Sequence, residues 1–405
     1  MSKYDIAIIG AGPAGIMAAI IASQNGRRIA LIEKNPQIGR KLLSTGNGRC
    51  NLTNSHLSQD RFHGATPEFI HTILNQFDQH ATMEFFENLG LILKEEDNGR
   101  IFPRTNQASS VVEVLKHRLS VKNVDVIPDT QVTAIKKAST WIISLNNGKT
   151  IESKKLIIAT GGRAAHHLGS TGDGLHWAQK LGHSVTPIHA ALVPVETVET
   201  WPRDIQGTKV EAGIRVTSDS LETGETIGDL LFTSYGVSGP AIMAQAGSIA
   251  PMLKTSRAII HIDLFPDMTE KQLGQTVSKL LRNGKNIADS LIGLLPSSLI
   301  PIILKTAGLR ERDRIDEIPR SKRLELVGIM KDLTLTVSKL RPLKEAQVTA
   351  GGLDTQEINP QSLESRLVKN LFFAGEIIDV DGDSGGFNLQ WAWSSGHVAG
   401  RSAAE

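Results

Sequence analysis

The chain has 405 residues, which is long for one domain and predicts two or three domains of roughly 100–200 residues each. A hydrophobic content of 40% and a charged content of 21% are typical of globular proteins, and the formal net charge of +2 gives no overall attraction to nucleic acid or membrane. No apolar run reaches the ~18–20 residues of a membrane span, and Cys50, the single cysteine, excludes an intrachain disulfide. The N-terminal apolar run contains an acid and lacks the form of a signal peptide, so we expect a cytoplasmic protein without membrane contact.

The N-terminal stretch predicts a strand at residues 4–9, a glycine turn matching G-x-G-x-x-G, a helix at residues 16–25 and a strand at residues 28–32 that ends in Glu33. This order is the fingerprint of a Rossmann dinucleotide site. The glycines permit a tight turn, a close approach of a pyrophosphate and close packing of helix on strand, while the acid accepts hydrogen bonds from the ribose. The expected contacts are Gly10, Gly12, Pro13, Ala14, Gly15 and Glu33.

Two polar segments follow this fingerprint. Residues 34–41 carry three bases, and residues 44–54 are so rich in Gly, Asn, Ser and Thr that we expect a flexible loop outside the core. Backbone and amide donors in such a loop can surround a polar ligand. The expected cofactor contacts here are Lys34, Arg40, Lys41, Gly48 and Arg49, with Lys41 and Arg49 steadying the phosphates or the ring.

Helices are predicted at residues 66–90, at residues 108–119 with Ser109 and Ser110 as capping residues, and at residues 175–181. Between the last two, a β-meander is expected at residues 124–151, with a hairpin turn of the Asn-Gly type. A buried strand at residues 155–159 then ends in two glycines, which predicts a second backbone approach to the same ligand. The expected contacts are Val132, Thr160, Gly161 and Gly162.

The composition changes after residue 185. Short strands dominate residues 185–262, helices are predicted for residues 269–335, and a strand at residues 370–376 returns to the opening pattern before a helix at residues 387–402. We therefore predict a discontinuous α/β domain interrupted by a β-rich domain that itself carries a helical domain. The predicted bounds are 1–188 with 346–405, 189–268 with 326–345, and 269–325.

Three strands that each end in glycine favour one long cofactor touched at several points, and FAD has the necessary length. The last helix would place its N-terminus beneath the flavin ring and favour negative charge there. The interior holds no second G-x-G-x-x-G unit, so NAD(P)H is expected to bind transiently without a dedicated domain. The expected contacts in the last segment are Gly375, Glu376, Asp379, Gly386, Phe387, Asn388 and Leu389.

Several motifs, taken together and in order, resemble one family along nearly the whole chain. They are Gly39-Arg40-Lys41-Leu42, Gly46-x-Gly48-Arg49-Cys50-Asn51, Ile101-Phe102-Pro103, Leu231-Phe232-Thr233, Ser238-Gly239-Pro240, Ala374-Gly375-Glu376 and Gly385-Gly386-Phe387-Asn388, besides the first glycine turn. The chain resembles the bacterial NAD(P)/FAD-dependent oxidoreductases of the BaiN/RdsA type, which are also known as aminoacetone oxidase-like flavoproteins.

The resemblance implies a Rossmann-type FAD-binding domain of the glutathione-reductase superfamily, with an inserted β-barrel-like domain and a nested helical domain. It also implies reduction of a conjugated C=C bond by hydride from the reduced flavin. One branch of the family reduces bile-acid enones, and another makes dihydrouridine in 23S ribosomal RNA. This chain departs from the family pattern at Asn47, at Phe387 in place of Tyr, and at His166 and His167.

Cys50 and Arg49 are the predicted catalytic residues. A thiol in a flexible loop beside a guanidinium is in the kind of setting that tunes cysteine reactivity, and it could deliver the proton that accompanies the hydride. The alternative is a small buried residue without chemistry. The sequence Asp379-x-Asp381-x-Asp383 resembles a calcium loop, but Ser384 stands where that loop needs glycine, and no metal site is predicted.

Residues 309–345 hold ten Lys or Arg side chains and seven acids, which favours a solvated helical surface over a face for ribosomal RNA. The prediction is an FAD-dependent, NAD(P)H-driven reductase of an activated C=C bond, with uridine of 23S rRNA as the favoured substrate. The enzymatic alternatives are a reductase of small enones such as 3-dehydro bile acids and a flavin amine oxidase. A flavin-bearing RNA-binding or sensor module is the alternative without turnover.

Overall fold

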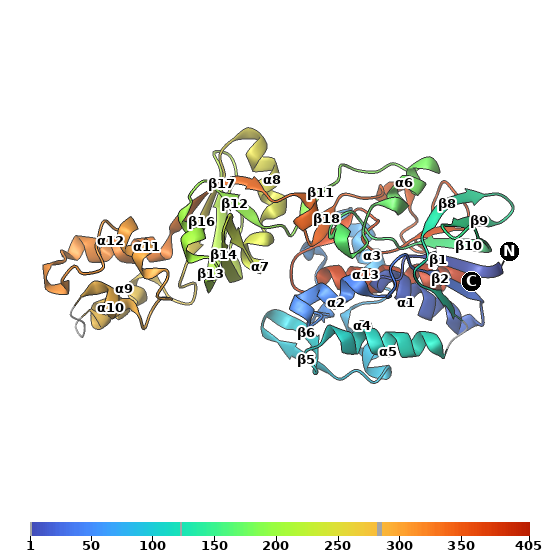
Figure 1. The fold of residues 1–405 in the computed structure, drawn as a ribbon, viewed down its shortest axis with the longest axis horizontal. Helices are drawn as coiled ribbons and strands as arrows, with labels where there is room; N and C mark the ends of the chain where they lie inside the picture. The colour runs from blue at the N-terminus through green and yellow to red at the C-terminus, as the bar shows by residue number, and fades with distance from the viewer. Residues whose placement is uncertain (1, 122–123, 282–285) are drawn as a thin grey trace. The chain divides into compact units, whose positions relative to one another are not determined.

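The computed structural model describes residues 2–121, 124–281 and 286–405, and the chain divides into two compact units (Figure 1). The terminal unit combines Met1–Ala190 with Ala346–Glu405, and the inserted unit is Ala191–Glu345. The division of the inserted unit into a β-rich and a helical domain stays a prediction. Among the described residues, no helix is long and apolar enough to cross a membrane.

A seven-stranded sheet in the order β7-β2-β1-β10-β9-β8, with β19 also paired to β10, lies at the centre of the terminal unit. β1, β2, β7, β10 and β19 run parallel, and β8 and β9 join as an antiparallel hairpin. The parallel strands are apolar toward their carboxyl ends, as at residues 6–9, 29–32, 156–158 and 371–373, because both faces of the sheet are covered there. The bounds are β1 Ser2–Ile9, β2 Ile29–Ile32, β7 Val124–Ile127, β8 Val132–Lys137, β9 Trp141–Leu145, β10 Thr150–Ile158 and β19 Leu371–Phe373.

Two helices from opposite ends of the chain pack against each other beside this sheet. They are α1 (Pro13–Ala22) and α13 (Phe387–Ala404). A Cβ atom on Gly396 would lie 2.4 Å from the carbonyl oxygen of Ala14, and one on Gly400 would lie 2.5 Å from that of Ala18. Only glycine at these two positions allows the two backbones to approach so closely.

Smaller elements complete the terminal unit (Figure 1). The strands β3, β6 and β5 form one sheet, β4 pairs with β20, and β11 pairs with β18. The helices are α2 Arg40–Ser44, α3 Pro67–Leu74, α4 Gln79–Asn88, α5 Ala108–Ser120 and α6 Asp173–Lys180. The strands are β3 Thr53–Asn54, β4 Phe62–Gly64, β5 Leu93–Glu96, β6 Arg100–Pro103, β11 His189–Ala191, β18 Val348–Ala350 and β20 Val380–Gly382.

The inserted unit contains a closed barrel in the order β12-β15-β14-β13-β16-β17, which confirms the predicted β-barrel-like insertion. Alternate residues of β13, such as Ala212, Ile214 and Val216, are fully buried, as the period of a half-buried strand requires. The strands are β12 Val195–Thr197, β13 Lys209–Thr217, β14 Thr226–Thr233, β15 Gly236–Ser238, β16 Ile259–Asp263 and β17 Leu333–Leu340. The helices are α7 Pro240–Met243, α8 Ala246–Thr255, α9 Glu270–Leu280, α10 Ile287–Leu291, α11 Ile300–Thr306 and α12 Arg320–Lys331.

Four local predictions were wrong. The segment Val124–Ile127 is not part of the predicted β-meander, because β7 pairs parallel with β2 at the opposite edge of the sheet from β8. The first helix begins inside the glycine turn, because Pro13 occupies its first position, where the fixed φ of proline is already helical. The cap position of α5 is Gln107, without a side-chain cap, and not Ser109 or Ser110. The polar stretch expected to stay outside the core contains α2, a short helical turn and β3, and its residues Cys50, Leu52 and Thr53 have no exposed surface.

Candidate cofactor site

The glycine turn lies at the carboxyl edge of the sheet, where three neighbouring strands end. The amide of Gly10 donates to the carbonyl of Ile32 (2.8 Å), that of Ala159 to Ile9 (2.9 Å) and that of Ala374 to Ile158 (3.2 Å). These bonds bring the glycine turns after β1, β10 and β19 side by side. In open α/β sheets this edge is where ligands bind.

The glycines of the first turn differ in their surroundings. A Cβ atom on Gly15 would lie 1.9 Å from the carbonyl oxygen of Gly10, and one on Gly10 would lie 2.5 Å from that of Ala159. Around Gly12 no atom of the described residues comes within 4 Å of that position. Gly12 is also the N-cap residue of α1 and offers no side chain to the N–H groups of the first turn, which include those of Ala14 and Gly15. The open side of the turn can therefore accept an anion at a helix N-terminus.

Glu33 is almost fully buried at the end of β2. Its Oε2 atom accepts from the amide of Ala11 (2.8 Å), and its Oε1 atom accepts from the backbone and the side chain of Asn35 (2.8 Å each). The carboxylate thus holds the glycine turn and the next loop together. The Oε2 atom, which accepts one bond, keeps a lone pair for a further donor such as a ribose hydroxyl.

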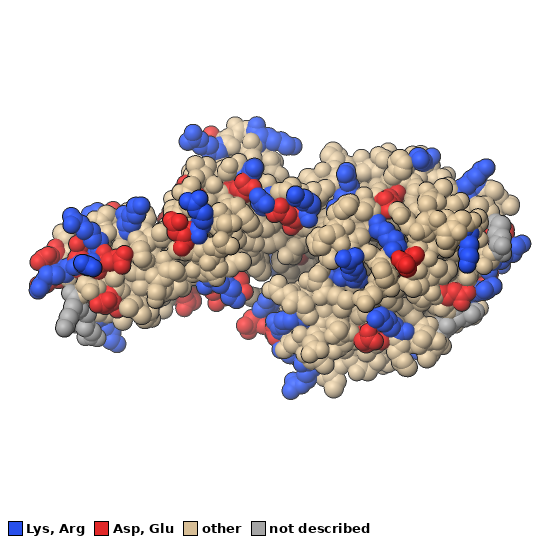
Figure 2. All heavy atoms as spheres, viewed as in Figure 1, with Lys and Arg blue, Asp and Glu red and all other residues tan. Residues whose placement is uncertain are grey.

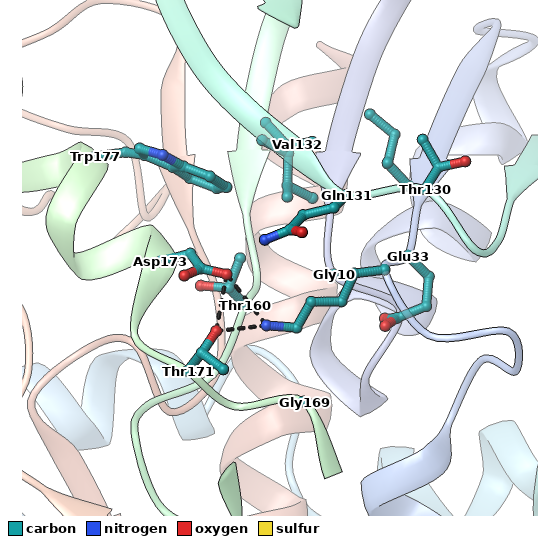
Figure 3. Close-up of a pocket in the computed structure, with 13 residues that line it drawn as sticks. Gly10, Glu33, Thr130, Gln131, Val132, Thr160, Gly169, Thr171, Asp173 and Trp177 are labelled. Atoms are coloured by element: carbon teal, nitrogen blue, oxygen red, sulfur yellow. Dashed lines mark hydrogen bonds and ion pairs between the residues drawn. The ribbon is translucent and has the colours of Figure 1, made fainter. Parts of the chain in front are cut away.

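A pocket opens beside Glu33 (Figure 3). Lys34 extends across it and contacts Thr171 Oγ1 (2.5 Å) and Asp173 Oδ2 (3.1 Å) at the start of α6. Apolar side chains such as Val132 and Trp177 face it from the other side. The lining residues are Ile9, Gly10, Ile32, Glu33, Lys34, Thr130, Gln131, Val132, Thr160, Gly169, Thr171, Asp173 and Trp177.

The second and third glycine turns are tied together through Thr349. Its hydroxyl oxygen accepts from the amides of Arg163 and Ala164 (2.8 Å each), and a Cβ atom on Gly162 would lie only 2.3 Å away. The backbone amide of Thr349 donates to Glu376 Oε1 (2.8 Å), and Glu376 Oε2 pairs with Lys41. Lys41 and Glu376 are therefore joined as an ion pair at the third turn.

The third turn also touches the first helix. A Cβ atom on Gly375 would lie 2.9 Å from that of Ala14, and the Gly375 amide donates to Ser395 Oγ (2.9 Å). Gly161 adopts a left-handed φ of +72°, as does Gly375 at +80°. Thr160 Oγ1, in the second turn, is buried and has no hydrogen-bond partner in the part of the chain that the structure describes.

The closing loop leads into α13, whose N-cap residue is Gly386 with φ +106° and no side-chain cap. Asn388 bonds within this loop, since it accepts from the Gly382 amide (2.9 Å) and donates to the Gly382 carbonyl (2.6 Å). Phe387 is buried and packs edge-on against Phe62, while Leu389 is half-buried. Close to Gly386, the Asn51 Oδ1 atom is buried and unpartnered among the described residues.

The setting predicted for Cys50 is wrong. Its side chain is fully buried, and burial raises the pKa of the thiol to about 12, although a hydrogen bond with Thr45 opposes the shift. Arg49 points elsewhere, with its guanidinium 2.5 Å from Glu96 and over the ring of Phe102 at 4.1 Å. The thiol is therefore not in an exposed, electropositive loop, and its role as proton donor stays a prediction.

The remaining predicted residues lie at the edge of this arrangement. Arg40 is exposed and donates to Asn35 Oδ1 (3.1 Å), and Gly48 has no described atom within 4 Å of a Cβ position. Asp379 lies on the closing segment, and its amide donates to the Leu353 carbonyl (3.1 Å). The sequence reasoning missed Thr171 and Asp173, which lie in the glycine-rich run of residues 169–174, just before the helix predicted at residues 175–181.

A Rossmann sheet with three glycine turns at one edge and an acid beside the first defines a dinucleotide-binding fold. The chain belongs to the HI0933-like family, because the model described as the HI0933-like protein Rossmann domain matches residues 4–402. This confirms the predicted flavoprotein family and fold class, and the chain is an FAD-type oxidoreductase.

Two curated relatives match over nearly their whole length. The chain is 35% identical over 405 residues to the 3-dehydro-bile acid delta(4,6)-reductase of Clostridium scindens, with 99% of each chain covered. It is 30% identical over 397 residues to the ribosomal RNA dihydrouridine synthase of Escherichia coli, with 98% of this chain and 96% of the relative covered.

A solved structure shares the fold. The 3-ketosteroid delta1-dehydrogenase of Sterolibacterium denitrificans superposes with a TM-score of 0.54 at 13% identity, and all of both chains is covered.

Proposed function

We propose that the chain reduces a C=C bond conjugated to a carbonyl group, with FAD as the resident cofactor and NAD(P)H as the transient electron donor. FAD supplies the hydride when it is bound. The two curated relatives support this reaction, since one is a delta(4,6)-reductase and the other forms dihydrouridine, and both names describe saturation of a C=C bond. The convergence of three glycine turns at one sheet edge carries the cofactor part of the proposal.

Different residues of the chain would bind different parts of FAD. The first turn of α1 would bind the pyrophosphate through its N–H groups, and Glu33 would hold the adenosine ribose. The ion pair of Lys41 with Glu376 would lie beside the middle of the cofactor. The uncapped N-terminus of α13, next to the unpartnered Asn51 oxygen, would receive the ring. Buried polar atoms without partners fit a site completed by a ligand.

Two substrates share this chemistry: uridine in 23S rRNA, predicted from the sequence, and a small enone of the 3-dehydro-bile-acid kind. The charge distribution favours the small enone. On the face drawn in Figure 2, Lys and Arg side chains are interspersed with Asp and Glu. Within residues 309–345, half of the bases contact acids, namely Arg314, Lys322, Lys331, Lys339 and Arg341. A phosphate backbone would require a surface with more unpaired bases.

The test is an anaerobic two-step assay of the purified FAD-loaded protein. NADPH or NADH is expected to bleach the flavin, and a 3-dehydro-delta(4,6) bile acid or a 23S rRNA transcript is expected to restore its colour. If neither probe reoxidises the flavin while air does so rapidly with release of peroxide, the protein is an oxidase and the proposal is wrong. If no nicotinamide bleaches the flavin, the sensor alternative is favoured instead.

A deletion strain separates the two substrates. If the chain acts on ribosomal RNA, dihydrouridine is lost from 23S rRNA in the deletion strain and returns with a plasmid copy. An unchanged dihydrouridine map removes the RNA substrate and leaves the small enone.

A further inference from the structure

The segment between the third glycine turn and α13 is held rigidly. It contains β20, which pairs with β4 so that Asp381 lies opposite His63. Cβ atoms on Gly64 and Gly352 would lie 2.6 Å and 2.7 Å from backbone atoms of Asp379, and only glycine permits such contacts. Both ends of the segment adjoin turns that the proposed function assigns to FAD, and β20 lies between them in the chain.

Asp381 is the one acid of this segment that is both buried and without a hydrogen bond among the described residues. It is 8% exposed, and its surroundings act on it through burial and charge alone. The nearby Asp383 differs, since it contacts His63 (2.9 Å) and Arg61 (3.3 Å). The residue is nearly buried, yet its carboxyl oxygens keep some exposed surface, so the group can exchange a proton with water and contact a ligand.

Some of the charged groups around Asp381 raise its pKa and others lower it. Burial is the largest effect and raises the pKa, as do the neighbouring Asp379 and Glu376, while His63 and His189 lower it. The resulting pKa is about 6, compared with 3.8 for an ordinary aspartate. A carboxyl with such a pKa exchanges its proton near neutral pH, which suits a general acid. The buried thiol of Cys50, with a pKa of about 12, releases a proton far less readily.

We propose that Asp381 is the acid that protonates the substrate during C=C reduction, an inference that rests on the proposed function. The hydride and its electron pair form a new C–H bond at the carbon β to the carbonyl. The π electrons move toward the carbonyl, and the α carbon takes the proton of the Asp381 carboxyl. The product gains two hydrogens, and the carboxylate left behind recovers its proton from water.

The decisive variants are Asp381→Asn, Asp381→Glu and, as a control at an exposed acid of the inserted unit, Asp219→Asn. All are loaded with FAD, reduced anaerobically by NADPH and mixed with the 3-dehydro-delta(4,6) bile acid or the 23S rRNA transcript. Asp381→Asn is expected to be bleached at the wild-type rate but reoxidised about 100-fold more slowly or worse, the usual size of a general-acid contribution. Asp381→Glu should recover part of the rate, and Asp219→Asn should stay near wild type.

A second readout needs neither substrate nor turnover. Because the folded-state pKa of Asp381 is raised, the wild-type protein should lose stability as pH rises from 3.8 to about 6, and Asp381→Asn should lack that loss. The wild-type reoxidation rate should also fall about tenfold per pH unit above the pKa, because the acid must be protonated.

The outcomes separate the two proposals. If neither probe reoxidises the wild-type flavin, the proposed function fails. If wild type reacts and Asp381→Asn reacts equally fast, or if the wild-type rate shows no break near about pH 6, the role of Asp381 is overturned. Should the asparagine variant fail to bind FAD, the pH profile of the wild-type rate decides alone.

Discussion

His397 should make the terminal unit sensitive to acid. Its ring lies on α13 and stacks on Phe77 with centroids 4.4 Å apart and an interplanar angle of 14°. Its Nδ1 atom is buried without a partner among the described residues. Burial first, and then the positive charge of Arg401, lower the pKa of this histidine from 6.5 to about 4.

The direction and size of the effect follow from this pKa. The folded state favours the neutral ring of His397. The contribution of this ring to the free energy of unfolding is therefore complete above pH 6.5 and is lost as pH falls toward 4. At about 1.4 kcal/mol per pKa unit, the full contribution is about 3 kcal/mol, of which about 2 kcal/mol is lost at about pH 5.

The substitution His397→Phe keeps an aromatic ring against Phe77 and removes the titration. The free energy of unfolding of wild type and variant is measured with urea at about pH 7.5 and about pH 5. Its decrease between the two pH values should be about 2 kcal/mol smaller in the variant. His117→Phe, at an exposed position on α5, serves as the control and should behave as wild type. If the free energy of unfolding falls equally in wild type and in His397→Phe, His397 is not the group that makes the fold sensitive to acid.

Three further predictions concern the cofactor site. Gly12→Ala should leave the free energy of unfolding nearly unchanged but weaken FAD binding about tenfold or more. Gly15→Ala should lower the free energy of unfolding by about 3 kcal/mol or more, because its Cβ would overlap the Gly10 carbonyl. Similar stability losses in both variants would contradict this. Lys41→Met should cost about 1–3 kcal/mol by leaving Glu376 half-satisfied, measured by urea unfolding of the protein without FAD, and no loss would mean that the ion pair is not formed in solution. The Cys50 thiol should react with a thiol reagent only after denaturation, and Cys50→Ala should retain FAD; rapid labelling of the folded protein would disprove its burial.

Local patterns predicted the Rossmann fingerprint because its parts are adjacent in sequence. Residues 4–33 contain a strand, a glycine turn, a helix and an acid, and the residue pattern of each segment is enough to predict it. The environment of Cys50 depends instead on distant residues. Trp393 donates to the Leu52 carbonyl (3.0 Å) and Thr53 bonds to Gln390 (2.5 Å), so a polar stretch that looks like a loop is covered by α13.

The same reason explains the missed partners of the glycine turns. Thr349 joins the turns after β10 and β19, yet nothing in its own neighbourhood in the sequence marks it. Likewise, Asp381 was visible only as part of an apparent calcium loop. Its burial opposite His63 could not be predicted, since that depends on the pairing of β20 with β4.

The glycine contacts between α1 and α13 bear on the order of events during translation. The ribosome releases α1 first, but its partner surface emerges only after more than 370 further residues have been synthesised. The intervening barrel can close while the nascent chain is still growing, whereas the terminal unit can complete its fold only after α13 has been synthesised. We therefore expect the coenzyme to bind late in biogenesis, and stalled chains that lack α13 should remain colourless.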